Sequence, residues 1–353
     1  MTDHGPVEFG LFTHIEKSSG SDALDALYEE HLAFLAAAEA AGFWGFHLAE
    51  HHSTPLSMTP SPSVFLAAAA QRTKRLRLGA MVYLLPFYQV LRLANEISML
   101  DNLTGGRLEV GVGRGISPFE HAYFGNPVLE SHEMYADALD ALVKGLSRDR
   151  LTHKGAYYRY HDVPMVVRPK QKPYPGLWYG IINTEGARYA ARHRMNVLSI
   201  GPSEHALHAL EAWHEAMAGA PAADAYNAHV RAPRFGVTRW VLIADTDKEA
   251  DALGRAAYAK FVENVQKLWS EWSVRDLRIG HDYDAMIAGG AMFVGSPGAV
   301  RDRIAREIET LPLNYVVLNM KWGNLSAAQS LHMLDLFATK VRPELPRVAR
   351  AVT

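Results

Sequence analysis

The chain has 353 residues, of which 48% are apolar, and its formal net charge is −2 with a sequence pI near 6.8. That charge balance argues against the basic surface that nucleic acids or anionic membranes require. Cysteine is absent, which excludes disulfides, thiolate nucleophiles and iron–sulfur ligation. Neither a signal peptide nor an apolar run of the roughly 20 residues that a membrane span needs is recognisable. We therefore expect a cytoplasmic protein with a large core and no nucleic-acid or membrane partner.

Short apolar strands alternate with amphipathic helices along the chain. The predicted strands are 7–14, 45–50, 76–86, 107–115, 177–182, 196–201, 236–244 and 314–320. The predicted helices are 22–41, 63–73, 88–103, 132–146, one beginning at Thr184, 204–217, 248–267, 299–310 and 326–340. Strict alternation predicts parallel strands covered by helices, and strands buried on both faces are expected to be almost wholly apolar, as these are. Eight such units favour a closed (β/α)8 TIM barrel over an open doubly wound sheet.

Two segments interrupt the alternation. Residues 151–175 contain aromatic stretches and prolines, which predicts a surface β-hairpin after the fourth strand. A second insertion follows the seventh strand, where 248–290 combines a helix with a poorly patterned stretch, 276–290. We interpret 248–290 as a candidate lid. No linker composition marks a second domain, so we expect one domain over 1–353.

Polar residues follow several predicted strands, and in such barrels the carboxyl ends of the strands carry the active site. The stretch "GFHLAEHHSTP" ends a strand with Glu50, His51 and His52. Adjacent residues on a strand point to opposite faces, so this His pair is poorly placed to chelate one metal ion. Two interpretations remain open: a hydrogen-bonded structural histidine, or a histidine that transfers protons near neutral pH.

Two further stretches are candidates for binding an anion. "GVGRG" (111–115) lacks the full dinucleotide-binding pattern, but Gly113 would let a flat ligand approach the backbone, and Arg114 could bind a phosphate. The alternative is a surface Arg in a turn. "NTEGAR" opens a helix at Asn183 and Thr184, whose free backbone N–H groups either bind an anion or are simply capped.

The combination of motifs resembles the bacterial luciferase-like flavin monooxygenases. The resemblance is carried by "AEHH", "LGAMVYLLPFYQVLRLANEISMLDNLTGGRLEVGVGRG", "FEHAYFG" and "GAYYRYHDVPMVVRPKQKPYPGLWYG", and it spans nearly the whole chain. It implies a (β/α)8 barrel that uses reduced FMN, often supplied by a separate reductase, together with O2. A flavin C4a-(hydro)peroxide would then oxidise an aldehyde, ketone, sulfonate or similar small molecule. Light emission is not implied.

The resemblance also implies roles for particular residues. His51 matches the catalytic histidine, and Glu50 would orient its ring or line the flavin site. Arg114 matches the arginine that binds the FMN phosphate, and Asn183 and Thr184 match the helix start that shares it. A cis peptide under the flavin would lie near Met81–Val82, and Asn95 is a weaker flavin candidate. Two positions depart from luciferase: Gly113 replaces a reactive Cys, and Ile182 replaces a Glu near the phosphate.

Alternatives to this function remain. The same fold supports hydride transfer with the deazaflavin F420, without O2, and a catalytically idle flavin-binding protein is a third interpretation. A homodimer is expected, with the helices 88–103 and 131–146 as candidate interfaces. Aromatic side chains near the strand ends either line an apolar pocket or belong to the core; they are Phe12, Tyr83, Phe87, Phe119 and Trp322.

Overall fold

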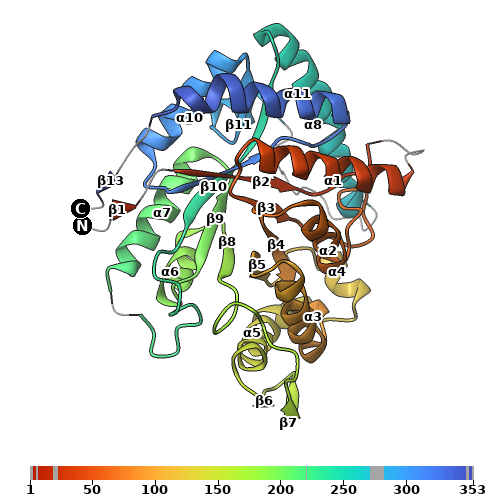
Figure 1. The fold of residues 1–353 in the computed structure, drawn as a ribbon, viewed down its shortest axis with the longest axis vertical. Helices are drawn as coiled ribbons and strands as arrows, with labels where there is room; N and C mark the ends of the chain where they lie inside the picture. Colours follow the sequence, from red (N-terminus) through yellow and green to blue (C-terminus); the bar gives the residue numbers. More distant parts are fainter. Residues whose placement is uncertain are drawn as a thin grey trace.

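The computed structural model describes residues 3–4, 7–18, 23–219, 221–270, 282–346 and 350–351, and within these ranges the chain forms a closed parallel barrel (Figure 1). The barrel strands run in the order β2-β3-β4-β5-β8-β9-β10-β12, and β12 pairs with β2 again. Their bounds are β2 Glu8–Thr13, β3 Gly45–Leu48, β4 Arg77–Leu84, β5 Leu108–Gly113, β8 Leu177–Ile181, β9 Asn196–Ile200, β10 Phe235–Ile243 and β12 Tyr315–Asn319. The predicted (β/α)8 architecture is confirmed.

Helices surround the sheet (Figure 1). They are α1 Leu24–Ala40, α2 Pro62–Arg72, α3 Val90–Leu103, α4 Pro118–Tyr123, α5 Ser131–Ser147, α6 Thr184–Arg192, α7 Ser203–Met217, α8 Asp247–Ser270, α9 Tyr283–Ala288, α10 Pro297–Thr310 and α11 Ala327–Leu336. Short 3-10 turns cover Leu85–Phe87 (η1), Val128–Glu130 (η2) and Arg342–Glu344 (η4), and a π-helical turn, Phe337–Val341 (η3), extends α11. Gly42 follows α1 with φ +80°, the left-handed conformation in which a glycine commonly ends a helix.

One of the strands that the sequence pattern missed belongs to the main sheet. β11 (Met292–Gly295) pairs with β10 in parallel, with Trp240 opposite Met292. Trp240 is also opposite Asn319 of β12, so β11 lies on the other side of β10, the side of β9. Its four residues are too few to show a recognisable pattern of apolar residues. They form a strand because β10 extends past its pairing with β9 and offers a free edge there.

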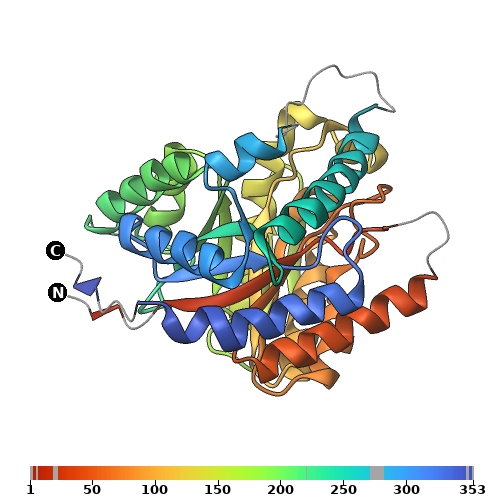
Figure 2. The same ribbon diagram turned by 90° about the horizontal axis from the view of Figure 1, so that it is seen from above.

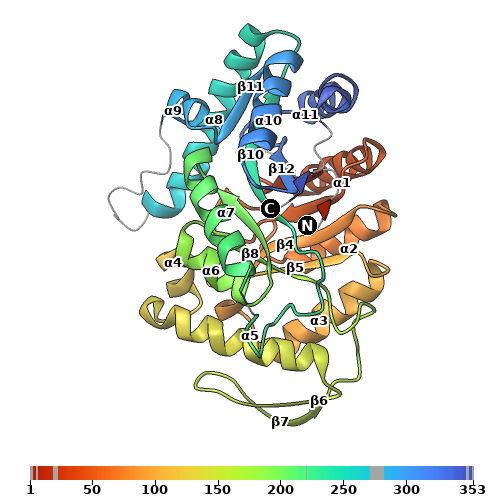
Figure 3. The ribbon, with the colours of Figure 1, turned by 90° about the vertical axis from the view of Figure 1, so that its left-hand side faces the viewer.

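The two insertions have different structures. The predicted hairpin forms from β6 (Arg150–Lys154) and β7 (Arg159–Pro164), and it projects beyond α5 at the lower end of the molecule (Figure 3). In the second insertion α8 packs against the barrel, while part of the stretch 276–290 lies outside the described residues. Near the termini, β1 (Asp3–His4) pairs antiparallel with β13 (Arg350–Ala351). None of the helices in the described ranges has the length and hydropathy to cross a bilayer.

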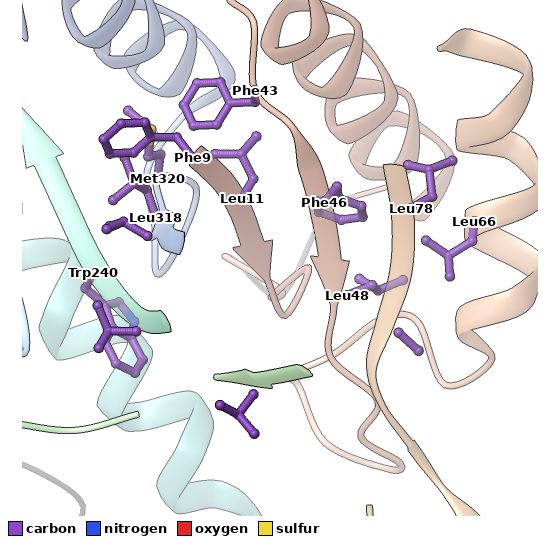
Figure 4. Close-up of a cluster of buried hydrophobic side chains, with 14 of the residues drawn as sticks. Phe9, Leu11, Phe43, Phe46, Leu48, Leu66, Leu78, Trp240, Leu318 and Met320 are labelled. Atoms are coloured by element: carbon purple, nitrogen blue, oxygen red, sulfur yellow. The ribbon is translucent and has the colours of Figure 1, made fainter. Parts of the chain in front are cut away.

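Buried side chains form two layers. The larger layer lies between the sheet and the helices, and Figure 4 shows Phe46, Leu66 and Leu78 within it. The smaller layer combines side chains from five barrel strands with Ala49, which follows β3, and these can meet only inside the barrel; they are Phe12, Ala49, Met81, Trp178, Leu198, Tyr315 and Val317. A polar group closes the amino end: Glu109 accepts hydrogen bonds from Trp178 Nε1 at 2.5 Å and from Arg77.

A buried ion pair fixes the loop that follows β9. Arg239 on β10 is 0% exposed, and its guanidinium donates to Glu307 on α10 and to the carbonyl oxygen of Gly201. Burial lowers the pKa of Arg239, and the charge of Glu307 opposes that shift. The pair therefore holds two strand–helix units together, because neither charge is stable there alone.

Replacing Glu307 with Gln is expected to lower the free energy of unfolding by about 3–5 kcal/mol, since it leaves the charge of Arg239 buried without a counter-charge. Urea denaturation of the two proteins measures the difference. Glu309→Gln on the exposed face of the same helix is the matched control, expected within about 0.5 kcal/mol of wild type. Equal transition midpoints for wild type and Glu307→Gln would contradict this role.

Candidate active site

The loops after β2 and β3 bring histidines together at the carboxyl end of the barrel. His14 follows β2, and His51 and His52 follow β3. Each loop turns sharply through a non-glycine residue in the left-handed region, Ile15 with φ +51° and Ser53 with φ +56°. This conformation is rare for a β-branched residue such as Ile15, which the buried packing of its side chain holds in place.

His51 and His52 are paired with two different carboxylates. His51 Nδ1 lies 3.3 Å from Glu120 Oε1, and the backbone N–H of His52 donates to the same oxygen at 2.7 Å. Glu120 is 1% exposed and comes from α4, whose N-cap Ser117 accepts from the Glu120 N–H at 3.2 Å. Because a carboxylate can only accept, His51 Nδ1 carries the proton and Nε2 is left for exchange.

Glu50 is hydrogen-bonded to His52 and not to His51, so of its two expected roles only that of lining the flavin site stays a prediction. Its carboxylate accepts from His52 Nε2 at 2.8 Å, from Tyr88 Oη at 2.8 Å and from the Leu84 N–H at 3.2 Å. Burial raises the pKa of Glu50, and the hydrogen bond from His52 opposes that shift. Glu50, His51 and His52 lie beyond the end of β3, and in this loop it is the His52 ring that reaches Glu50.

His14 adds a second imidazole beside His51. The two rings are stacked with centroids 5.7 Å apart, and the edge of His14 also contacts Phe12, with centroids 4.9 Å apart. Burial, with a smaller contribution from the charge of His51, lowers the pKa of His14 to about 3. His14 is therefore neutral near pH 7, and within this stack His51 is the ring with a carboxylate partner.

The third and fourth barrel strands meet irregularly beside this cluster. The Met81–Val82 peptide bond is cis, at the position that the family resemblance implies, and the Lys172–Pro173 bond is also cis. The pairing of β4 with β5 shifts register between Ala80 and Tyr83. A side chain on Gly113 would lie 2.3 Å from Val82 Cγ2, so Val82, and not a ligand, occupies the space beside Gly113.

Arg114, Asn183 and Thr184 lie at neighbouring strand ends, because β5 pairs with β8. Arg114 Nη1 donates to Ser131 Oγ at 2.9 Å, which leaves its other N–H groups available. Asn183 caps α6 by accepting from the Gly186 N–H at 2.8 Å, so the predicted cap is confirmed. Arg114 is half-buried and Asn183 is exposed, so both can be reached from solvent.

The inward side of β8 and β9 is open toward the carboxyl ends of these strands. Alternation places Gly180 on the same side as Trp178, and Ile200 on the same side as Leu198, both of which face the barrel interior. No atom lies within 4 Å of the position that a Gly180 side chain would occupy, and Ile200 is 41% exposed. The barrel interior is therefore filled on the amino side of Gly180 and open on its carboxyl side.

Several other predicted residues lie away from this cluster. Asn95 is on the exposed side of the outer helix α3, so the structure does not bring it to the strand ends. Tyr83 and Trp322 are buried in the outer layer between sheet and helices. No cluster of metal-ligating side chains occurs among the residues that the structure describes.

The sequence interpretation missed Glu120 and Tyr88 as partners of the site. Glu120 lies within the quoted stretch "FEHAYFG", where Ser117, Pro118 and an acidic residue two positions later are also the ordinary start of a helix. Nothing in the local pattern separates a carboxylate that caps a helix from one that holds an imidazole. The distinction required the contact across 69 positions of the chain.

Comparisons with known proteins agree with this architecture. The family described as luciferase-like monooxygenase matches residues 7–313. An uncharacterised protein, y4wF of Sinorhizobium fredii, is 31% identical over 92% of this chain and 94% of its own. Limonene 1,2-monooxygenase of Rhodococcus erythropolis is 26% identical over 97% of this chain and 87% of its own.

Two further comparisons concern an enzyme component and a solved structure. The oxygenase component of the flavin-dependent trigonelline monooxygenase of Acinetobacter baylyi is 27% identical over 54% of this chain and 53% of its own. The crystal structure of the monooxygenase RslO1 from Streptomyces bottropensis superposes with a TM-score of 0.83 and 25% identity, covering 95% of this chain and 99% of that one. With the barrel and the family match, these findings identify the chain as a member of the luciferase-like monooxygenase family, an enzyme of the flavin-dependent monooxygenase class.

Proposed function

We propose that the protein is the oxygenase of a two-component system, which uses reduced FMN and O2 to oxidise a small, uncharged organic molecule. The observation that carries this proposal is His51, oriented by the buried carboxylate of Glu120 at the open end of the barrel. A separate reductase as the source of reduced FMN is supported by the relative that is named an oxygenase component.

The residues at the barrel mouth fit FMN. Gly180 leaves open space on β8, and the exposed side chain of Ile200 lies on the neighbouring strand β9, so a flat ring could be admitted there. Arg114 and the amino end of α6 supply N–H donors on the neighbouring strands, which suits the terminal phosphate. Met81 and Val82 would lie against the ring, and Gly113 would act by admitting Val82 rather than by touching the flavin.

Bound reduced FMN supplies the electrons that activate O2. The chain's own residues orient the reactants, exclude water and control one proton. Glu120 holds His51 Nδ1, so that Nε2 can give or accept a proton at the reacting atoms. Glu50, His52 and Tyr88 form the buried support behind that loop. His14 stays neutral and adds no competing charge beside His51.

The surroundings of His51 favour an uncharged substrate. His14 is bordered by the rings of Phe12 and Phe261, and Phe261 also packs on Trp240 with centroids 5.5 Å apart. A charged group would have to be desolvated among these aromatic side chains. We therefore place an aldehyde or a ketone before a sulfonate as the substrate class.

We also propose a homodimer in the cytoplasm. Exposed apolar side chains on α2 and α3 supply the candidate interface: Val64 is 71%, Met99 60% and Leu103 43% exposed. The apolar face of α5 is already covered within the fold, so we withdraw the 131–146 helix as a candidate. The segment 248–290 as a lid, and one domain over 1–353, stay predictions.

Reduced FMN is expected to quench the tryptophan fluorescence of the protein at micromolar concentration under anaerobic conditions, and reduced F420 to bind far more weakly. Arg114 and the amino end of α6 offer donors that suit the single phosphate of FMN. Parallel anaerobic titrations measure both affinities. Tight binding of F420 alone would replace the proposal with hydride transfer, and binding of neither cofactor would contradict the FMN site.

Replacing Arg114 with Met is expected to weaken binding of FMN by about 10- to 100-fold, since a hydrogen bond to a charged group is worth about 1.5–3 kcal/mol. Riboflavin lacks the phosphate, so its affinity should not change. Arg188→Met, at a half-exposed Arg on α6, is the matched control. An equal loss for FMN and riboflavin would mean that Arg114 acts on the fold and not on the phosphate.

His51→Ala is expected to lower turnover by about 10²–10⁴-fold, the usual contribution of general acid–base catalysis, while FMN binding is kept. Glu120→Gln should cause a smaller loss, because the amide still accepts one hydrogen bond. Stopped-flow and product assays with a flavin reductase measure both, with His161→Ala in the exposed hairpin as control. Normal turnover in His51→Ala would remove the proposed role, and no turnover in wild type would favour an idle flavin-binding protein.

A further inference from the structure

A cavity of about 310 Å³, whose lining does not include His14, His51 or Arg114, lies between α1 and the loop that joins β12 to α11. The two helices lie side by side along one flank of the barrel (Figures 2 and 3). Small residues of α1, Ala23 and Ala26, make room on one wall, and the loop from Trp322 to Ala327 forms the other. The volume is at the lower end of the range for small-molecule sites.

The cationic side chain in the lining of this cavity is Lys321, which is 6% exposed. Its ammonium has three N–H donors, and Glu30 Oε2, at 3.3 Å, is the acceptor that it contacts within the described part of the chain. The side chain of Glu30 is 45% exposed, so this ion pair is weak and easily exchanged. A buried ammonium with one long contact has donors left for a ligand.

His31 lines the same cavity and is 3% exposed. Its Nδ1 lies 2.9 Å from the carbonyl oxygen of Leu27, so Nδ1 donates and Nε2 remains an acceptor. Burial, together with the charge of Lys321, lowers the pKa of His31 to about 3. The imidazole is therefore neutral and offers an acceptor, not a second positive charge.

Three carboxylates limit the charge that the cavity accepts. Asp25 lies in the first turn of α1, Glu30 faces Lys321, and Glu16 forms part of the lining. Both oxygens of Glu16 are engaged, since they accept from Asn264 Nδ2 and from the Gly323 N–H at 3.0 Å each. These groups oppose a dianion such as phosphate, whereas a single carboxylate could replace Glu30 at Lys321.

We propose that this cavity is a second binding site, which takes a small hydroxycarboxylate: the carboxylate pairs with Lys321 and the hydroxyl donates to His31 Nε2. The amino ends of α1 and α11, at Ala23 and Ser326, lie on the same cavity and favour the carboxylate end. The site is independent of the flavin site and of the proposed oxidation.

Calorimetric titration of the intact protein with 2-, 3- and 4-hydroxybutyrate tests the proposal. At least one of them should bind, and more tightly than butyrate, which lacks the hydroxyl, butane-1,3-diol, which lacks the carboxylate, and inorganic phosphate. Lys321→Met should weaken binding tenfold or more, because it keeps the side-chain stem and removes the ammonium. Lys340→Met, at an exposed Lys beyond α11, is the control.

Glu30→Gln is expected to change the affinity for the hydroxycarboxylate in the opposite direction. Because the Glu30 side chain is 45% exposed, this substitution does not disturb the core. It removes the internal competitor for Lys321, so binding should become about two- to fivefold tighter, the range that an exposed ion pair is worth. Unchanged affinity in Glu30→Gln, or in a folded Lys321→Met, would overturn the proposal. So would failure of all three hydroxybutyrates at millimolar concentration, or loss of binding in His51→Ala, which would place the ligand in the other site.

Discussion

Hydrogen bonding between β9 and β10 closes the sheet, and the geometry of the candidate active site depends on that closure. An open sheet of the same strands would leave the ends of β2 and β8 far apart. In the closed barrel they face a common space, so residues from the loops after β2, β3 and β5 can meet there. The order of strands in the chain then decides which loops are neighbours: β3 lies beside β2, which is why His51 stacks on His14.

The barrel interior changes in character along its axis, and this gradient separates stability from chemistry. At the amino end, Glu109 is satisfied by Trp178 and Arg77, and His47 Nε2 lies 3.0 Å from Tyr315 Oη, so that end is closed by hydrogen-bonded polar groups. Apolar side chains fill the middle. Toward the carboxyl end the side chains on β8 become small, and the interior opens at Gly180.

Buried carboxylates explain how two adjacent histidines can have different roles. A charge inside a protein is costly unless hydrogen bonds satisfy it. Glu50 meets that condition with three donors, and it therefore supports the fold of the loop through His52. Glu120 accepts a hydrogen bond from the backbone N–H of His52 and a second from His51 Nδ1, so His51 Nε2 stays available. The pairing divides the "EHH" trio into one structural and one chemically active imidazole.

The sequence by itself determined the barrel, because each strand–helix unit carries a local signal: apolar runs for buried parallel strands, a helical period, and turn residues such as Gly42. It also placed His51, Arg114 and Asn183 at strand ends, since position within a unit follows from that local pattern. Only the tertiary structure decided the partners. Glu120 lies 69 positions from His51, β11 needed the free edge of β10, and Val82 fills the space at Gly113 through a shift in register. Such contacts depend on which segments pack together, and no local period in the chain records that.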